Sequence, residues 1–389
     1  MSRQSTDKAH ASTAAPIDWD QYCETFHVNW HSGNGWPAPR RLLRVSADLS
    51  ADQALKLLTQ GTALLWEGDF HQGRQLLSSI KRRLVTRLSI EPSAPMPEAF
   101  HKLRLARSQQ ARLLGMILIR VEPGWSLSLS RALPIDAACR AASGEIDTPI
   151  LMPLTELLGI LSAYQWQLNG VEVAALQGRI YPRHGVFAPT RQEYLSLLAN
   201  TPLPDPCVSA IDLGTGTGVI AAILAQRGVA QVTAIDHYAP ALACARDNIE
   251  RLGLSDAVQV QEGDLLTHSP KVDLIVCNPP WLPGIVRSAL DAAVHDPDHR
   301  MLKGFLKAAP QHLKPGGQAW LIMSSLAELL GLRSREQLLQ WIDEAGLQVM
   351  QRHDTLPTHP KASRQSDPLA AWRSQEVTSL WRLSLAGTL

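Results

Sequence analysis

From about residue 205 onward, short apolar runs alternate with helical patterns, and this alternation constrains the fold more than any other feature. The predicted strands cover residues 207–213, 230–236, 257–261, 272–277 and 317–323, and the predicted helices cover 218–227, 240–252, 300–313 and 328–345. Strands and helices in alternation indicate a parallel sheet with crossover helices. Two later runs, 347–353 and 377–385, are separated by a polar stretch too long for a tight turn and predict an antiparallel addition at the sheet edge. The expected fold class is therefore α/β.

The first predicted strand runs into a glycine-rich turn, Gly214-Thr215-Gly216-Thr217-Gly218, and then into a helix. Glycines accept positive φ and let backbone amides approach a ligand closely, and the helix N-terminus adds unpaired N–H donors. The spacing is GxGxG, whereas the dinucleotide fingerprint is GxGxxG, because Val219 stands where the third fingerprint glycine would be. The turn therefore predicts a cofactor loop and disfavours a nicotinamide dinucleotide.

Acidic residues occur at the carboxyl ends of successive predicted strands, where ligands bind in open α/β sheets. Asp212 precedes the glycine turn and is expected to face a ligand ammonium group. Asp236 ends the next strand, about where a carboxylate accepts two ribose hydroxyl protons. Asp264 follows the third strand and is expected to accept from an adenine amino group. Each aspartate alone is commonly a cap or turn residue, but their order along the sheet predicts a ligand site.

The fourth predicted strand, residues 272–277, ends in Asn278-Pro279-Pro280-Trp281. The Asn278 side-chain oxygen and the Pro279 carbonyl can each accept one N–H of a planar NH2 group, which favours a pyramidal nitrogen with a directed lone pair. Trp281 offers a face on which a flat group can stack. These four residues predict a reaction at an NH2 nitrogen that depends on positioning and electrostatics rather than on a strong base. The alternative is a plain Pro-Pro turn that closes the strand.

Residues 205–323 resemble a class I S-adenosylmethionine-dependent methyltransferase, because the glycine loop, the two later aspartates and the Asn-Pro-Pro-aromatic motif occur in the family's order. The resemblance implies a Rossmann-like seven-stranded sheet, mostly parallel, whose last strand is antiparallel. It implies S-adenosylmethionine as the cofactor and Asn278, Pro279, Pro280 and Trp281 as catalytic residues. The implied cofactor-binding residues are Asp212, Gly214, Thr215, Gly216, Gly218, Asp236, Asp264 and Asn278.

The segment from Gly178 to Thr190 resembles the stretch that precedes the methyltransferase core in amino-methylating enzymes, including the HemK-like glutamine methyltransferases. In that family the segment closes over the methionine end of the cofactor, which adds Thr190 to the implied cofactor-binding residues. Its alternative is a Pro-rich linker between domains. We therefore expect a disordered tail over 1–16, an N-terminal substrate-recognition domain over 17–178 and the methyltransferase domain over 179–389.

The N-terminal domain is expected to be mixed and largely helical. The predicted elements are a helix opened by the capping box of Ser50 and Gln53, a helix capped by Asp69 that runs to about Leu88, a helix from Glu98 to about Leu114, helices near 132–143 and 153–166, and a hairpin formed by Met116–Val121 and Ser126–Ser130. Basic residues strongly outnumber acidic ones between Arg74 and Arg120. Such an excess can track phosphates or an acidic partner, but it is also typical of solvated helix faces.

The predicted function is that of an S-adenosylmethionine-dependent N-methyltransferase acting on a planar NH2 nitrogen. The acceptor is a glutamine amide of a protein, for example one involved in translation, or an exocyclic amine of an RNA or DNA base. Tyrosine is usual at the position of Trp281 in HemK-like enzymes, whereas Phe or Trp occurs in some nucleic-acid amino-methyltransferases, so both acceptor classes stay open. The alternatives are a non-catalytic binding scaffold with a methyltransferase fold and a nicotinamide-dependent oxidoreductase.

Composition adds three expectations. The five cysteines are odd in number and show no zinc-ligand spacing, so no metal site is predicted. No apolar run approaches the roughly 20 residues of a membrane span, and the first residues lack the apolar core of a signal peptide. The net charge of +1 by itself predicts no partner. We therefore expect a cytoplasmic protein with reduced cysteines and no membrane partner.

Overall fold

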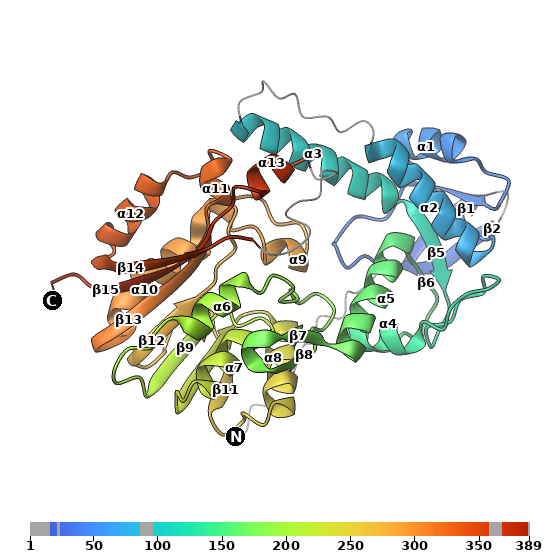
Figure 1. The fold of residues 1–389 in the computed structure, drawn as a ribbon. Helices are drawn as coiled ribbons and strands as arrows, with labels where there is room; N and C mark the ends of the chain where they lie inside the picture. The colour runs from blue at the N-terminus through green and yellow to red at the C-terminus, as the bar shows by residue number, and fades with distance from the viewer. Residues whose placement is uncertain (1–15, 22–23, 86–95, 358–367, 388–389) are drawn as a thin grey trace, which may run out of the picture. The chain divides into compact units, whose positions relative to one another are not determined.

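A computed structural model describes residues 16–21, 24–85, 96–357 and 368–387, and it divides the chain into two compact units (Figure 1). The N-terminal unit comprises Met1–Ser89 and Lys102–Ser162, and the C-terminal unit comprises Ile90–His101 and Ala163–Leu389. The expected disordered tail lies outside the described residues except for Pro16. No helix of the described residues is long and apolar enough to cross a membrane.

The C-terminal unit is built on a seven-stranded sheet. Its strands are β9 (Ser209–Leu213), β10 (Gln231–Asp236), β11 (Val258–Glu262), β12 (Val272–Cys277), β13 (Leu313–Ser324), β14 (Leu347–Thr355) and β15 (Thr378–Leu385). The spatial order is β11-β10-β9-β12-β13-β15-β14, and β15 alone runs antiparallel to its neighbours. The expected α/β fold, a mostly parallel sheet with an antiparallel last strand, is confirmed.

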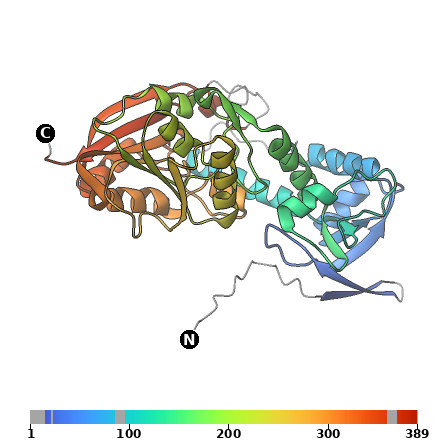
Figure 2. The same cartoon turned by 90° about the horizontal axis from the view of Figure 1, so that it is seen from below.

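Helices cover both faces of this sheet, as the views in Figures 1 and 2 show. The helices that pack on the sheet are α6 (Glu193–Asn200), α7 (Val219–Gln226), α8 (Ala239–Arg251), α10 (Arg300–His312) and α12 (Arg335–Glu344). The unit also contains the short helices α9 (Ala289–Ala292), α11 (Leu326–Leu329) and α13 (Ala370–Arg373) and 3-10 turns at Ala174–Leu176 and Pro297–His299. A small two-stranded sheet of β7 (Val171–Val173) and β8 (Gly178–Ile180) precedes them.

Two buried apolar layers hold the large sheet. The layer under α6, α7 and α8 includes Leu274 and Val276, and the layer under α10 and α12 includes Ile275 and Cys277. Successive side chains of a strand point to opposite faces, so β12 contributes to both layers in alternation. A strand that is buried on both faces reads as an unbroken apolar run, which explains why its bounds follow directly from the sequence.

The strand order reverses at β9, whose neighbours are β10 on one side and β12 on the other. Ligands of open α/β sheets bind at such a switch point, outside the carboxyl ends of the strands. In β12, Cys277 lies opposite Leu213 of β9 in parallel register. The glycine turn and the Asn-Pro-Pro-Trp motif therefore leave the sheet side by side.

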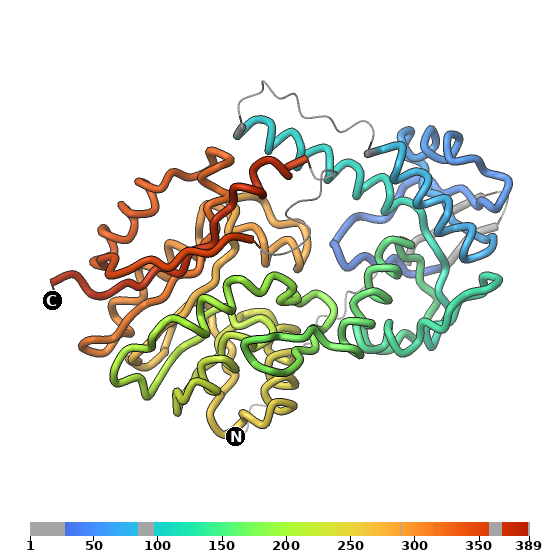
Figure 3. Tube along the Cα trace, in the orientation of Figure 1, coloured from blue at the N-terminus to red at the C-terminus, as the bar shows by residue number. Residues whose placement is uncertain are grey.

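The N-terminal unit contains a six-stranded sheet of order β1-β2-β6-β5-β4-β3, of which β3 to β6 are traced in blue to green in Figure 3. Its strands are β1 (Pro16–Gln21), β2 (Glu24–Trp30), β3 (Arg41–Val45), β4 (Thr62–Trp66), β5 (Ile117–Val121) and β6 (Ile150–Pro153). The helices of this part of the chain are α1 (Ala51–Thr59), α2 (Phe70–Val85), α3 (Met96–Leu114), α4 (Asp136–Ser143) and α5 (Leu154–Asn169). The mixed character is confirmed, but the sequence did not predict this sheet.

The two helix caps predicted for this unit are confirmed and the first arm of the predicted hairpin is strand β5, whereas the hairpin pairing is wrong. Ser50 and Gln53 form the capping box of α1, and the Asp69 carboxylate accepts backbone N–H groups at the start of α2. β5 pairs with β4 on one side and β6 on the other, so both of its edges are used. The expected second arm, Ser126–Ser130, keeps only an isolated bridge between Glu122 and Ser126.

Candidate functional site

The glycine turn after β9 is fastened to the next strand. The backbone N–H groups of Gly214 and Thr215 both donate to the carbonyl of Ile235, at 2.8 and 2.9 Å. Gly214, Gly216 and Gly218 have φ values of 75°, 55° and 81°, in the left-handed region that favours glycine. Three such glycines at alternating positions allow the chain to leave β9 and enter α7 in one tight turn.

The space around the three glycines differs, and Gly216 is the open one. A Cβ atom on Gly214 would lie 2.5 Å from Cε of Met301, and one on Gly218 would lie 3.3 Å from Ala245. A Cβ atom on Gly216 would meet nothing within 4 Å. Gly216 therefore offers bare backbone to a ligand, which is the close approach expected of a cofactor loop.

Asp236, at the end of β10, is tied to this loop. One of its carboxylate oxygens accepts the Gly216 N–H at 3.0 Å, and the other accepts the Tyr238 N–H at 3.0 Å. Both bonds come from backbone and leave lone pairs on each oxygen, since a carboxylate has about four acceptor positions. The structure thus brings Asp236 and Gly216 together, as the sequence predicts.

Asp212, in β9, is fully buried on the face covered by α7. Its Oδ2 atom accepts the Thr215 hydroxyl at 2.6 Å and the Ala221 N–H at 3.0 Å. Its Oδ1 atom is buried and has no hydrogen-bond partner among the described residues. Burial raises the pKa of this carboxyl to about 7. An unpartnered oxygen of this kind fits a bound cation, such as the ammonium group of an amino-acid moiety.

Asp264 follows β11 but does not present a free carboxylate. Its Oδ2 atom forms an ion pair with the guanidinium of Arg300, at the start of α10, at 2.6 Å. Both side chains are more than half exposed, at 56% and 66%, so solvent screens the pair. No sequence pattern indicates that Arg300 lies at this site.

The motif Asn278–Trp281 forms a short lip at the end of β12. The indole N–H of Trp281 donates to Oδ1 of Asn278 at 2.9 Å. Pro279 is buried, and the other three residues are partly buried. Trp281 also packs against both apolar layers of the sheet. The lip is therefore anchored in the core beside the glycine turn.

Arg191 lies over the ring of Trp281, with its guanidinium carbon 4.9 Å from the ring centroid. Its Nε atom donates to Glu193 at 2.7 Å, and its Nη1 atom donates to Glu376 at 2.9 Å. Both carboxylate side chains are 1% exposed. Sequence reasoning missed this group, because Arg191 and Glu376 are 185 positions apart and belong to no common motif.

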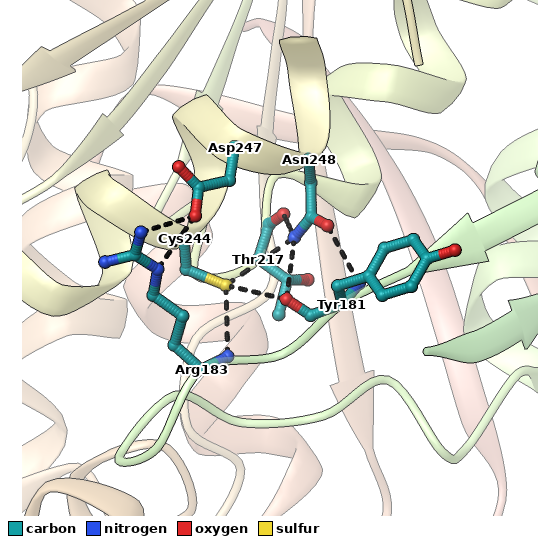
Figure 4. A network of polar contacts seen from close by, with 6 residues as sticks. All are labelled: Tyr181, Arg183, Thr217, Cys244, Asp247 and Asn248. Atoms are coloured by element: carbon teal, nitrogen blue, oxygen red, sulfur yellow. Dashed lines mark hydrogen bonds and ion pairs between the residues drawn. The ribbon is translucent and has the colours of Figure 1, made fainter. Parts of the chain in front are cut away.

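The segment Gly178–Thr190 is fastened to the glycine turn and to α8 (Figure 4). The fully buried Asn248 accepts the Tyr181 N–H at 2.8 Å and donates to the Thr217 carbonyl at 3.0 Å. The Arg183 guanidinium forms an ion pair with Asp247 at 2.5 Å, and the backbone N–H of Arg183 contacts the Cys244 sulfur at 3.4 Å, as Figure 4 shows.

Thr190, at the end of this segment, is partly buried, and its N–H donates to the Ala188 carbonyl at 2.8 Å. Because Asn248 joins Tyr181 to the glycine turn, the segment lies beside the predicted cofactor loop. Across the described residues, no group of three or more His, Cys, Asp or Glu side chains could hold a metal ion.

The chain is similar in sequence to known methyltransferases. Residues 177–329 match the family model of the methyltransferase small domain. A release factor glutamine methyltransferase of Moorella thermoacetica is 29% identical over 269 residues, which cover 62% of this chain and 91% of that protein. A release factor glutamine methyltransferase of Cereibacter sphaeroides is 34% identical over 137 residues, which cover 32% of this chain and 49% of that protein. These matches confirm the resemblance to the HemK-like methyltransferases.

A third relative is named for a nucleic-acid acceptor. The tRNA1(Val) (adenine(37)-N6)-methyltransferase of Cytophaga hutchinsonii is 28% identical over 138 residues, which cover 34% of this chain and 58% of that protein. The chain thus spans about half the length of two of the three curated relatives named above. The names of these three relatives include both acceptor classes predicted from the sequence, a glutamine and an adenine amine, and all three relatives are methyltransferases.

Proposed function

Because residues 177–329 match the family model of the methyltransferase small domain, we propose that this protein transfers the methyl group of S-adenosylmethionine to a planar NH2 nitrogen. The observation that carries the proposal is the pairing of Cys277 with Leu213, which sets the lip directly beside the glycine turn. We assign the methyltransferase role to residues 179–389 and substrate recognition to residues 17–178.

S-adenosylmethionine supplies an electrophilic methyl group when it is bound. Gly216 would bring its backbone against the cofactor, and Asp236 would accept the ribose hydroxyl protons with its remaining lone pairs. Asp212 would face the ammonium group with its unpartnered oxygen. Asp264 can accept from the adenine amine beside its ion pair with Arg300, because loosening an exposed pair costs only about 0–1 kcal/mol.

The remaining turn residues would support the same site. Gly214 and Gly218 shape the turn through their positive φ values, and Thr215 holds Asp212 in place. Thr190 would close the methionine end of the cofactor, since its segment is fastened to the turn through Asn248.

The lip would bind and orient the acceptor. The Asn278 side-chain oxygen keeps one lone pair beyond the bond from Trp281, and with the Pro279 carbonyl it can accept both N–H groups of an NH2 nitrogen. Holding both protons favours a pyramidal nitrogen and directs its lone pair. Pro280 stiffens the lip, because its ring fixes the backbone φ angle. The exposed part of the Trp281 ring would contact the flat acceptor group.

We propose two acceptor classes that share this chemistry, a glutamine side chain of a protein involved in translation and an exocyclic amine of an RNA or DNA base. A partner from the translation machinery would place the reaction in the cytoplasm. The related proteins support both classes through their names. A non-catalytic scaffold is the alternative, and it predicts no label transfer in any extract.

The test uses tritiated S-adenosylmethionine incubated with the protein and a cell extract, followed by separate digestion with nuclease and with protease. We expect macromolecular label that only one digestion releases, and that digestion identifies the acceptor class. Asn278→Ala should abolish incorporation while calorimetry shows that S-adenosylmethionine still binds. Full activity in this variant would contradict the proposed role of the lip.

A further inference from the structure

The bond between Trp281 and Asn278 fixes which end of the Asn278 amide faces the indole. An indole N–H can only donate, so its partner at 2.9 Å must be the amide oxygen and not the amide nitrogen. Without this donor the Asn278 amide could turn over and present its own NH2 group to the acceptor. The NH2 group of Asn278 and the NH2 group of the acceptor are both donors, so they could not form a hydrogen bond with each other. The indole N–H therefore keeps the lip in its accepting orientation.

The position of Trp281 depends in turn on Arg191. The guanidinium carbon of Arg191 lies 4.9 Å from the Trp281 ring centroid, within the range of a cation–π contact. A planar cation over one ring face opposes rotation of the indole about its side-chain bonds. Such contacts are stronger where water is excluded, and the Arg191 side chain is only 20% exposed.

Arg191 is itself held in one orientation by two buried carboxylates. Glu193 binds its Nε atom and Glu376 binds its Nη1 atom, and Glu376 also accepts the Ser324 hydroxyl at 2.5 Å. Bonds to two edges of a planar guanidinium fix the plane of the group. Ser324 is the last residue of β13, so the bond from Ser324 to Glu376 fixes the orientation of Arg191 relative to the central sheet.

These contacts join three separate segments at the lip. Arg191 follows the segment that is fastened to the glycine turn, Trp281 follows β12, and Glu376 lies two residues before β15. The long connection between β14 and β15 therefore reaches the acceptor side of the proposed site through Glu376. No family motif identified from the sequence includes Arg191 or Glu376.

We propose that Arg191, held by Glu193 and Glu376, is a positioning residue that acts through Trp281 to keep the Asn278 amide oxygen directed at the acceptor nitrogen. The inference rests on the proposed methyl transfer for its catalytic consequence, but the positioning itself is a property of the protein alone. It can therefore be tested with and without an acceptor.

The first test measures hydrogen exchange of indole N–H groups by NMR in the full-length protein labelled with 15N-tryptophan. The Trp281 signal is assigned as the one missing in Trp281→Phe. In Arg191→Met we expect its exchange to accelerate roughly tenfold, since the lost contact is of the strength reported for partly desolvated cation–π pairs. The buried Trp320 N–H, which donates to Gln318 at 2.9 Å, should exchange as in the wild type.

Arg335→Met is the matched control variant. Arg335 also pairs with a carboxylate, Glu328 at 2.8 Å, and lies over a tryptophan ring, Trp381, at 6.0 Å, and neither of these partners belongs to the lip. It should leave the Trp281 exchange rate unchanged. Unchanged exchange in Arg191→Met, or equal acceleration in Arg335→Met, would overturn the proposal.

Removing Arg191 alone leaves two buried carboxylates without their cation, which can prevent folding. The triple variant R191M/E193Q/E376Q removes all three charges together and should fold, and the same acceleration of Trp281 exchange is expected in it. Unchanged exchange in the triple variant would equally overturn the proposal.

The second test measures initial rates of label incorporation into cell extract at saturating S-adenosylmethionine. Arg191→Met, or the triple variant, should lower the rate roughly tenfold with cofactor affinity within about twofold of the wild type, because the contact acts on the acceptor side. An unchanged rate would overturn the catalytic part of the inference. Absence of incorporation with wild-type protein would refute the proposed function instead, and the exchange measurement would still decide the positioning.

Discussion

The buried carboxyl of Asp212 should make cofactor binding depend on pH. Burial raises its pKa from 3.8 to about 7. A change of about three units corresponds to roughly 4 kcal/mol between the two protonation states. Because the folded-state pKa lies above the unfolded value, the stability contribution of the protonated carboxyl is complete below about pH 4 and is lost as the pH rises through about 7. Near neutral pH, the free protein therefore holds this proton only in part.

A ligand ammonium group next to the unpartnered Oδ1 atom would favour the ionised form of Asp212. Binding would then release the proton, and affinity should rise with pH. With a free-state pKa of about 7 and full ionisation in the complex, the ionised fraction of the free protein gives a rise of roughly twentyfold between about pH 5.5 and about pH 7.5.

The assay is titration calorimetry with S-adenosylmethionine across this pH range, in buffers of different ionisation enthalpy that reveal proton release. Asp212→Asn, which keeps an acceptor oxygen for Thr215 and Ala221, should show weaker and pH-independent binding. A constant wild-type affinity with no proton release would mean that Asp212 caps α7 and does not face the ammonium group.

Two further substitutions separate the site from its surroundings. Gly216→Ala places a methyl group in open space, so thermal melts should show only the roughly 1–2 kcal/mol of left-handed backbone strain. The same variant should lose at least tenfold in cofactor affinity. Gly253→Ala, with φ 68° and equally open surroundings, is the control and should show the strain without the loss of affinity. Asn248→Ala leaves the buried Thr217 carbonyl and the partly buried Tyr181 N–H without this partner and should cost about 2–4 kcal/mol in denaturant unfolding. Asp247→Ala, which removes a more exposed ion pair, should cost less than about 1 kcal/mol.

The fold of the C-terminal unit could be predicted because its signals are local. β12 matches its predicted bounds, residues 272–277, since a strand buried on both faces is one apolar run. The N-terminal sheet was not predicted, although β5 lies within the predicted strand Met116–Val121 and β4 and β6 are also buried apolar runs. Its strands are short, and β2 pairs with β6 across more than a hundred residues, at Asn29 and Ile150. Pairing between distant short strands leaves no pattern in either one.

The candidate site likewise contains some contacts that could be predicted from the sequence and others that could not. Asp236 and Gly216 could be brought together from the sequence, because residues that end parallel strands share one edge of the sheet. The ion pair of Asp264 with Arg300 and the contact of Arg191 with Glu376 could not, since each joins side chains from separate elements. Such contacts depend on side-chain packing, which no spacing encodes.

Trp281 illustrates why this difference matters for the acceptor. A larger ring gives more stacking area, which taken alone would favour a nucleobase over a glutamine side chain. In the structure, however, its N–H holds Asn278, one ring face lies against Arg191, and its remaining surface packs partly on both apolar layers. These contacts explain a tryptophan at this position without reference to the acceptor, since a phenylalanine has no N–H donor for the Asn278 oxygen. The identity of residue 281 therefore reports on how the lip is held, and it favours neither acceptor class.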